Sequence, residues 1–129
     1  NKYGSLIKFI NSFYISKNEL LEMKDSGMEL GVHCVNHFPY KGPADVFFKQ
    51  EISPCIDYFK NQLGFTPYYY TPAFGGGINY REMLIELEPI LKDNGFKRGF
   101  TTIGTKFNAN KDTFWINRID CNQVEKLLL

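Results

Sequence analysis

The chain has 129 residues, which is the size of one domain, and 43% of them are hydrophobic, which excludes an intrinsically disordered tail. Its 15 basic and 14 acidic residues leave a net charge of +1, which argues against a nucleic-acid-binding protein. No apolar run approaches the roughly 20 residues that cross a membrane. We therefore expect residues 1–129 to form a single domain, and both abrupt ends favour a truncated one.

The first part of the chain alternates strand and helix patterns. An apolar, β-rich run predicts a strand over 6–10. Ser16 and Glu19 have the spacing of a capping box, which predicts a helix over 17–26 that ends at a glycine. Residues 28–32 then alternate apolar with polar or small side chains, which is typical of a second strand.

The rest of the chain continues the same alternation. Pro89 lies inside the second helix of this part and is expected to kink or split it. Strands that alternate with helices imply right-handed crossovers and a mostly parallel sheet, so the predicted fold class is α/β. The predicted elements are a loop over 33–43, a helix over 46–63, a strand over 67–70, a helix over 79–94, strands over 96–102 and 113–119, a surface loop over 103–112 and a final helix that begins at Asn122.

His33 and His37 are the chain's two histidines, and His33 directly follows the strand predicted over 28–32. Two imidazoles four residues apart could hold one ion of zinc, cobalt, nickel or iron where the backbone turns suitably. The carboxyl ends of parallel strands are where α/β proteins build their sites. Two surface or capping histidines are the alternative, because this spacing alone is a weak signal.

Residues 21–37 contain the end of a helix, a glycine, the strand Glu-Leu-Gly-Val and then His-Cys-Val-Asn-His. This order resembles the second motif of the NodB-homology polysaccharide deacetylases, carbohydrate esterase family 4. The resemblance runs from Tyr3 to about Asp120 and implies part of a distorted (β/α) barrel with a mostly parallel sheet. Further matching segments are 51–52, 63–67, 71–75, 94–96, 100–102 and 117–119.

The resemblance implies a hydrolase that removes acetyl groups from acetylated amino sugars of a polysaccharide. His33 and His37 would then be ligands of a divalent metal, usually zinc. By the same resemblance the backbone N–H of Phe74 would donate to the oxyanion, and Pro72 and Ala73 would line the substrate groove; an ordinary strand-to-loop turn is the alternative for this segment. The family also implies an extracytoplasmic or cell-surface location, and the sequence does not specify the glycan.

The sequence departs from the family pattern in three places. The Thr-Phe-Asp-Asp-Gly motif, which supplies the catalytic base and a third ligand, does not occur in these residues, and neither does the closing Leu-x-His motif. Thr71 stands where the family has an arginine. Two explanations stay open: an excerpt of a longer enzyme, or a degenerate relative that binds carbohydrate without catalysis. A structural metal or interaction module is a third possibility, and a missing first strand would leave a barrel edge through which copies could associate.

Several other residues have two interpretations each. Trp115, the single tryptophan, could line the sugar site or pack in the core. Cys34 could ligate metal or be a small packed side chain, and Asn36 could orient a ligand histidine or form the loop turn. Gly75–Gly77 fits a flexible loop better than a phosphate cradle, and Arg118 could support a catalytic base or be a surface charge.

Overall fold

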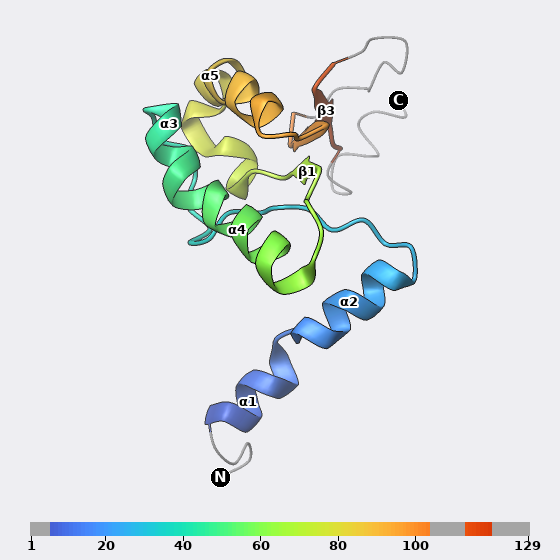
Figure 1. Cartoon of the computed structure of the whole chain (residues 1–129). Helices are drawn as coiled ribbons and strands as arrows, with labels where there is room; N and C mark the ends of the chain where they lie inside the picture. The colour runs from blue at the N-terminus through green and yellow to red at the C-terminus, as the bar shows by residue number, and fades with distance from the viewer. Residues whose placement is uncertain (1–5, 104–112, 120–129) are drawn as a thin grey trace, which may run out of the picture.

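The computed structural model describes residues 6–103 and 113–119 (Figure 1), and within them three strands form one parallel sheet. The sheet has the order β1-β2-β3, and each strand falls inside a predicted one. The predicted α/β class with parallel strands is therefore confirmed. The loop predicted over 103–112, from residue 104 on, and the helix predicted to begin at Asn122 lie outside the described residues. The strands are β1 (Tyr69–Tyr70), β2 (Arg98–Thr101) and β3 (Trp115–Asn117).

The segment predicted as the second strand pairs with β1 at one residue. Val32 forms an isolated parallel bridge with Tyr70. The N–H of Val32 donates to the carbonyl of Tyr69 (2.8 Å), and its carbonyl accepts from the N–H of Thr71 (2.9 Å). The strand predicted over 28–32 is thus too long, because β1 offers only two residues of partner backbone.

The helical elements largely follow the prediction. A continuous helical stretch from α3 to η2 confirms the helix predicted over 46–63, and α5 confirms the helix predicted over 79–94. Among the described residues, no helix is long and apolar enough to cross a membrane. The helices are α1 (Leu6–Phe13), α2 (Lys17–Asp25), α3 (Ala44–Phe47), η1 (Phe48–Ile52), α4 (Ser53–Tyr58), η2 (Phe59–Leu63), η3 (Ala73–Asn79) and α5 (Tyr80–Asp93).

α2 begins with the predicted capping box. The N–H of Ser16 donates to the carboxylate of Glu19 (2.7 Å), and the N–H of Glu19 donates to the Ser16 hydroxyl (3.3 Å). The two bonds satisfy two donors that a helix start leaves without intrahelical partners.

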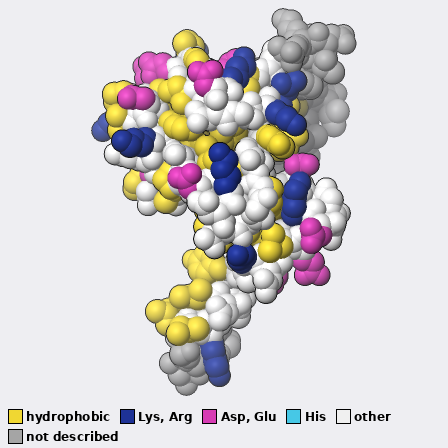
Figure 2. Space-filling model, viewed as in Figure 1, with side chains coloured by type: hydrophobic (Ala, Val, Ile, Leu, Met, Phe, Trp, Pro, Cys, Tyr) yellow, Lys and Arg dark blue, Asp and Glu magenta, His cyan; other side chains and the backbone are white. Residues whose placement is uncertain are grey.

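The strand predicted over 6–10 is wrong, because these residues form the start of helix α1 (Leu6–Phe13). Leu6, Ile10 and Phe13 recur at helical spacing, and among the described residues no strand pairs with this segment. α1 projects from the body of the molecule (Figure 1), and its apolar side chains form an exposed patch at that end (Figure 2).

α5 is a single α-helix through Pro89, so the predicted split does not occur. A proline inside a helix removes one hydrogen bond and costs about 3 kcal/mol. The core face of α5 offsets this cost, since Leu87 and Leu91 on either side of the proline are fully buried and each contributes about 1.5–3 kcal/mol.

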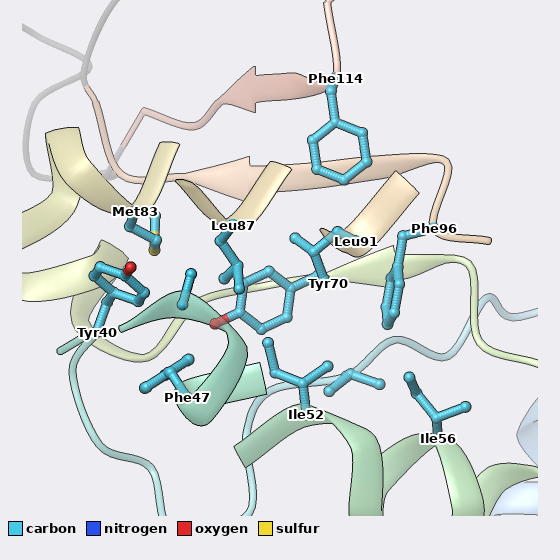
Figure 3. Packing of buried hydrophobic residues seen from close by; sticks show 12 residues of the cluster. Tyr40, Phe47, Ile52, Ile56, Tyr70, Met83, Leu87, Leu91, Phe96 and Phe114 are labelled. Carbon is cyan, nitrogen blue, oxygen red and sulfur yellow. The ribbon is translucent and has the colours of Figure 1, made fainter. Parts of the chain in front are cut away.

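The core lies where the long helical stretch and α5 meet the sheet (Figure 3). The Tyr70 ring of β1 lies at its centre and is fully buried. Side chains from both helical stretches converge on this ring, and Phe96 contacts it edge to face. The labelled members are Tyr40, Phe47, Ile52, Ile56, Tyr70, Met83, Leu87, Leu91, Phe96 and Phe114.

We predict that Leu87→Ala lowers the free energy of unfolding by about 2–5 kcal/mol, because it leaves a cavity at a fully buried position. Urea unfolding followed by circular dichroism measures the loss. Ile85→Ala on the same helix is the matched control, because its side chain is 76% exposed, and its effect should stay within about 0.5 kcal/mol. Equal losses for the two variants would contradict this description of the core.

Candidate functional site

The structure brings the two histidines together at the end of the sheet. The Val32 bridge places His33 beside the chain that leaves β1, where its Nδ1–H donates to the carbonyl of Thr71 (2.7 Å). The Nε2 atoms of His33 and His37 lie 3.0 Å apart, and the ring centroids are separated by 4.8 Å. Two side chains predicted as metal ligands therefore direct the same ring nitrogen toward one point.

The hydrogen bond to Thr71 determines the tautomer of His33. A carbonyl only accepts, so Nδ1 of His33 carries the proton and Nε2 of the neutral ring has a free lone pair. In the metal-free arrangement the Nε2–H of His37 can donate to that lone pair. Metal-binding histidines in proteins are commonly fixed by such a bond from the other ring nitrogen to a carbonyl.

The loop between the histidines turns through left-handed backbone. Cys34 has a φ of 68° and His37 a φ of 57°, which residues other than glycine rarely adopt. Such conformations cost on the order of 1–3 kcal/mol each and persist where the surroundings enforce them. The turn is what lets two rings four residues apart face each other.

Asn36, between the histidines, is held by a carboxylate that the sequence analysis did not single out. Glu51 of η1 is 5% exposed. Its Oε2 accepts from the N–H of Asn36 (2.9 Å), and its Oε1 accepts from Nδ2 of the same residue (2.7 Å). Of the two interpretations of Asn36, these contacts favour a role in holding the loop. The signal that could have revealed Glu51 is its place four residues after buried Phe47 and next to buried Ile52.

Cys34 turns toward the core. Its Sγ lies 3.4 Å from the hydroxyl of Tyr70, and burial raises the pKa of the Cys34 thiol. A raised pKa disfavours the thiolate, which is the form that binds metal. These contacts agree with a small packed side chain.

A hollow of about 390 Å³ opens beside the two imidazoles. Pro72 and Phe74 line it, and Arg118, whose Nε donates to the carbonyl of Thr101 (3.1 Å), lines it as well. Ala73 is 1% exposed and is not among the lining residues. The full lining consists of Gly31, Val32, His33, His37, Thr71, Pro72, Phe74, Gly75, Thr102 and Arg118.

Trp115 lies away from this hollow. Its indole N–H donates to the carbonyl of Leu84 (3.0 Å), and its ring contacts those of Tyr70 and Phe114 at the core. Of its two interpretations, the contacts favour packing in the core.

The described part of the chain offers no third ligand beside the histidines. Within residues 6–103 and 113–119, no group of three or more His, Cys, Asp or Glu side chains is placed to hold a metal ion. A catalytic zinc site usually has three protein ligands, so the two imidazoles form a partial ligand set.

Comparisons with known proteins agree with this arrangement. The model of the family described as polysaccharide deacetylase matches residues 6–88, which is more than half of the chain. The chain belongs to the polysaccharide deacetylase family. A search of curated proteins finds no significant match.

The fold of this chain is also similar to that of a solved structure of IcaB from Ammonifex degensii. The TM-score is 0.67 at 21% sequence identity, and the match covers 87% of this chain and 51% of that one. The chain therefore spans about half the length of the IcaB chain, and the expected relation to the deacetylase barrel is confirmed at the level of the fold.

Three glycines follow Phe74 and form a packed turn. Phe74 has a φ of 51°, and its ring, 66% exposed, contacts the His37 ring at a centroid distance of 4.7 Å. Gly75 has a φ of 64°, and a Cβ there would lie 1.9 Å from Oγ1 of Thr102. Gly75 and Gly76 are buried, so the turn is closely packed against its surroundings.

We predict that Gly75→Ala lowers the free energy of unfolding by more than about 1–2 kcal/mol, which is the cost of left-handed backbone alone for a residue with a Cβ atom. The added methyl group would collide with Thr102, a residue that lines the hollow. Gly95→Ala is the matched control, because Gly95 has a φ of 86° but a Cβ added there would meet no atom within 4 Å. Thermal and urea unfolding compare the two variants, and equal losses would show that the close approach at Gly75 is not a constraint.

Proposed function

We propose that the chain contributes to a metal-dependent hydrolase that removes acetyl groups from acetylated amino sugars of a polysaccharide. The observation that supports this most directly is the 3.0 Å approach of two Nε2 atoms beside an open hollow, in a member of the polysaccharide deacetylase family. The reaction class is hydrolysis of a carbon–nitrogen bond outside a peptide.

The residues present fit a divalent metal, which we propose to be zinc. His33 and His37 would hold it, since neutral imidazole nitrogens are good zinc ligands and His33 already keeps Nε2 unprotonated through Thr71. When bound, such an ion polarises a carbonyl and increases the acidity of water. We assign the role of catalytic base to no residue of this chain.

Backbone and apolar groups of the chain would position the substrate. We propose that the N–H of Phe74, at the mouth of the hollow, donates to the oxyanion, a role that backbone amides fill in acyl transfer. Pro72 would form the wall of the substrate groove beside it. Ala73, which we also predicted for this groove, is buried next to Pro72 in the sequence and would support the wall, whereas Trp115, the third predicted residue, packs in the core and would not contact the substrate.

The proposed activity also indicates a partner and a place of action. The substrate would be a polysaccharide or oligosaccharide with N-acetylated sugars, and we propose an extracytoplasmic or cell-surface location. A homo-oligomer formed through an exposed barrel edge stays a prediction.

We predict that the chain binds one equivalent of zinc and that His33→Ala and His37→Ala each abolish this binding or weaken it strongly. The loss of zinc affinity should exceed the roughly 10–100-fold loss that follows removal of a residue that only supports a metal ligand. Titration calorimetry on metal-stripped protein measures it. Tyr58→Ala, which removes an exposed ring from α4, is the control and should bind like the unaltered chain. Binding that survives both histidine variants would refute the proposed ligands.

The catalytic part of the proposal needs its own assay. We expect a protein that adds a third metal ligand and a catalytic base to this chain to release acetate from oligomers of N-acetylglucosamine, and its His33→Ala and His37→Ala variants to release none. Acetate is quantified by an enzyme-coupled assay over several hours. Sugar binding without acetate release would instead support the alternative of a carbohydrate-binding relative that has lost catalysis.

A further inference from the structure

We propose that Glu51 is a positioning residue: through Asn36 it holds the loop in which the two imidazoles converge. The inference rests on the proposed metal site, because convergence of the rings matters for function only if both bind one ion. Glu51 forms its hydrogen bonds to this loop with Val35 and Asn36 and not with an imidazole ring, so its effect on the histidines would pass through the loop backbone.

Glu51 accepts three hydrogen bonds from the two residues that directly precede His37. Its main-chain carbonyl accepts from the N–H of Val35 (3.1 Å). Its carboxylate accepts from the backbone N–H of Asn36 (2.9 Å) and from Nδ2 of the same side chain (2.7 Å). Backbone and side chain of Asn36 are thus fixed together, which leaves its orientation, and that of the next residue, little freedom.

The burial of Glu51 makes this contact consequential. A carboxyl group that is 5% exposed has lost nearly all its contact with water and depends on protein donors for its hydrogen bonds. Each of its two oxygens accepts such a bond from Asn36, at 2.9 and 2.7 Å. Removal of either the loop donors or the carboxylate would therefore leave the other without its hydrogen-bond partner.

Glu51 lies in a π-helical turn of the long helical stretch. η1 (Phe48–Ile52) is π-helical, and the N–H of Ser53 donates to the carbonyl of Phe48, five residues back. Pro54 follows directly and cannot donate to the carbonyl four residues before it, which disturbs the regular α-helical pattern. Single π-helical turns of this kind are frequent at functional sites.

The contacts of the histidines show which movement the hydrogen bonds between Glu51 and Asn36 would prevent. The carbonyl of Thr71 holds the ring of His33. His37 depends on a left-handed φ of 57°, which is unfavourable for a residue with a side chain. If Asn36 is released, the following residue can relax to right-handed backbone, and the second Nε2 then moves away from the first.

The first test is the metal affinity of Glu51→Gln. The introduced amide has one oxygen and one NH₂ group, so it cannot accept from both donors of Asn36. We expect zinc to bind about 10–100-fold more weakly, as for loss of other outer-shell partners. The visible spectrum of the Co²⁺-substituted protein should change as well, since it reports on ligand geometry. Wild-type affinity together with a wild-type spectrum would overturn the proposal.

Glu86→Gln is the matched control for general weakening of the loop. Glu86 accepts from the hydroxyl of Tyr40 (2.6 Å), so it is a carboxylate that holds the same loop three residues after His37. We expect this variant to bind zinc within about twofold of the unaltered chain, because it does not act between the ligands. All affinities are measured where circular dichroism shows folded protein. An equal loss in both variants would overturn a specific role for Glu51.

A reversal of the hydrogen bond makes the test sharper. In the double variant Asn36→Asp, Glu51→Gln, the new amide can donate to the new carboxylate and still accept from the backbone N–H at position 36. We expect this pair to recover most of the affinity that Glu51→Gln loses, while Asn36→Asp alone, which faces two carboxylates, should be the weakest of the three. Failure of the pair to recover any affinity would overturn the proposed contact.

A metal-free measurement separates this inference from the proposed function. In the stripped protein, NMR should show nuclear Overhauser effects between the imidazole protons of His33 and His37, whose centroids lie 4.8 Å apart. We expect Glu51→Gln to lose these signals and Glu86→Gln to retain them. If the unaltered chain binds no metal, the proposed function fails and this comparison still decides the role of Glu51. Signals that persist unchanged in Glu51→Gln would overturn it.

Discussion

The pairing of Val32 with β1 is the constraint from which the arrangement of the site follows. Two backbone hydrogen bonds, at 2.8 and 2.9 Å, fix Val32 against Tyr69 and Thr71. Gly31 permits this approach, since a Cβ there would lie 2.8 Å from the carbonyl oxygen of Tyr69. The next residue is His33, which the same pairing places beside Thr71. One bridge in the sheet thus determines the position of the first imidazole, its tautomer and the start of the loop that returns to it.

Local sequence patterns predicted most of the fold because the pattern and the packing agree. The apolar periodicity of the long helical stretch and of α5 describes elements that bury one face, and the capping box before α2 satisfies the donors at a helix start locally. The prediction was wrong at residues 6–10, where a short apolar run has strand propensity and helical spacing at once. Strand formation needs a partner backbone, and propensity carries no information about whether one is present.

Residue type and spacing were enough to predict the candidate ligands of the site. They were not enough to predict the contacts between residues that are far apart in the sequence. His33 and His37 could be placed after a predicted strand from the sequence, whereas their close approach depends on the left-handed backbone of the turn between them. Glu51 lies 15 residues from Asn36, and an acidic residue on a helix is usually a solvated one. Only the folded chain shows that the loop supplies its donors. Trp115 illustrates the reverse case, because an aromatic side chain that could bind sugar instead has its indole N–H satisfied inside the protein.

The division between exposed and buried groups explains how the site can be both accessible and fixed. The two rings are exposed, whereas Glu51 and Val32, which determine the backbone around them, are buried. The hydrogen bond to Thr71 leaves the Nε2 lone pair of His33 free, and this atom faces Nε2 of His37 at 3.0 Å. The ring atoms of the proposed metal site are therefore open to solvent, whereas the residues that hold their backbone in place are shielded from it.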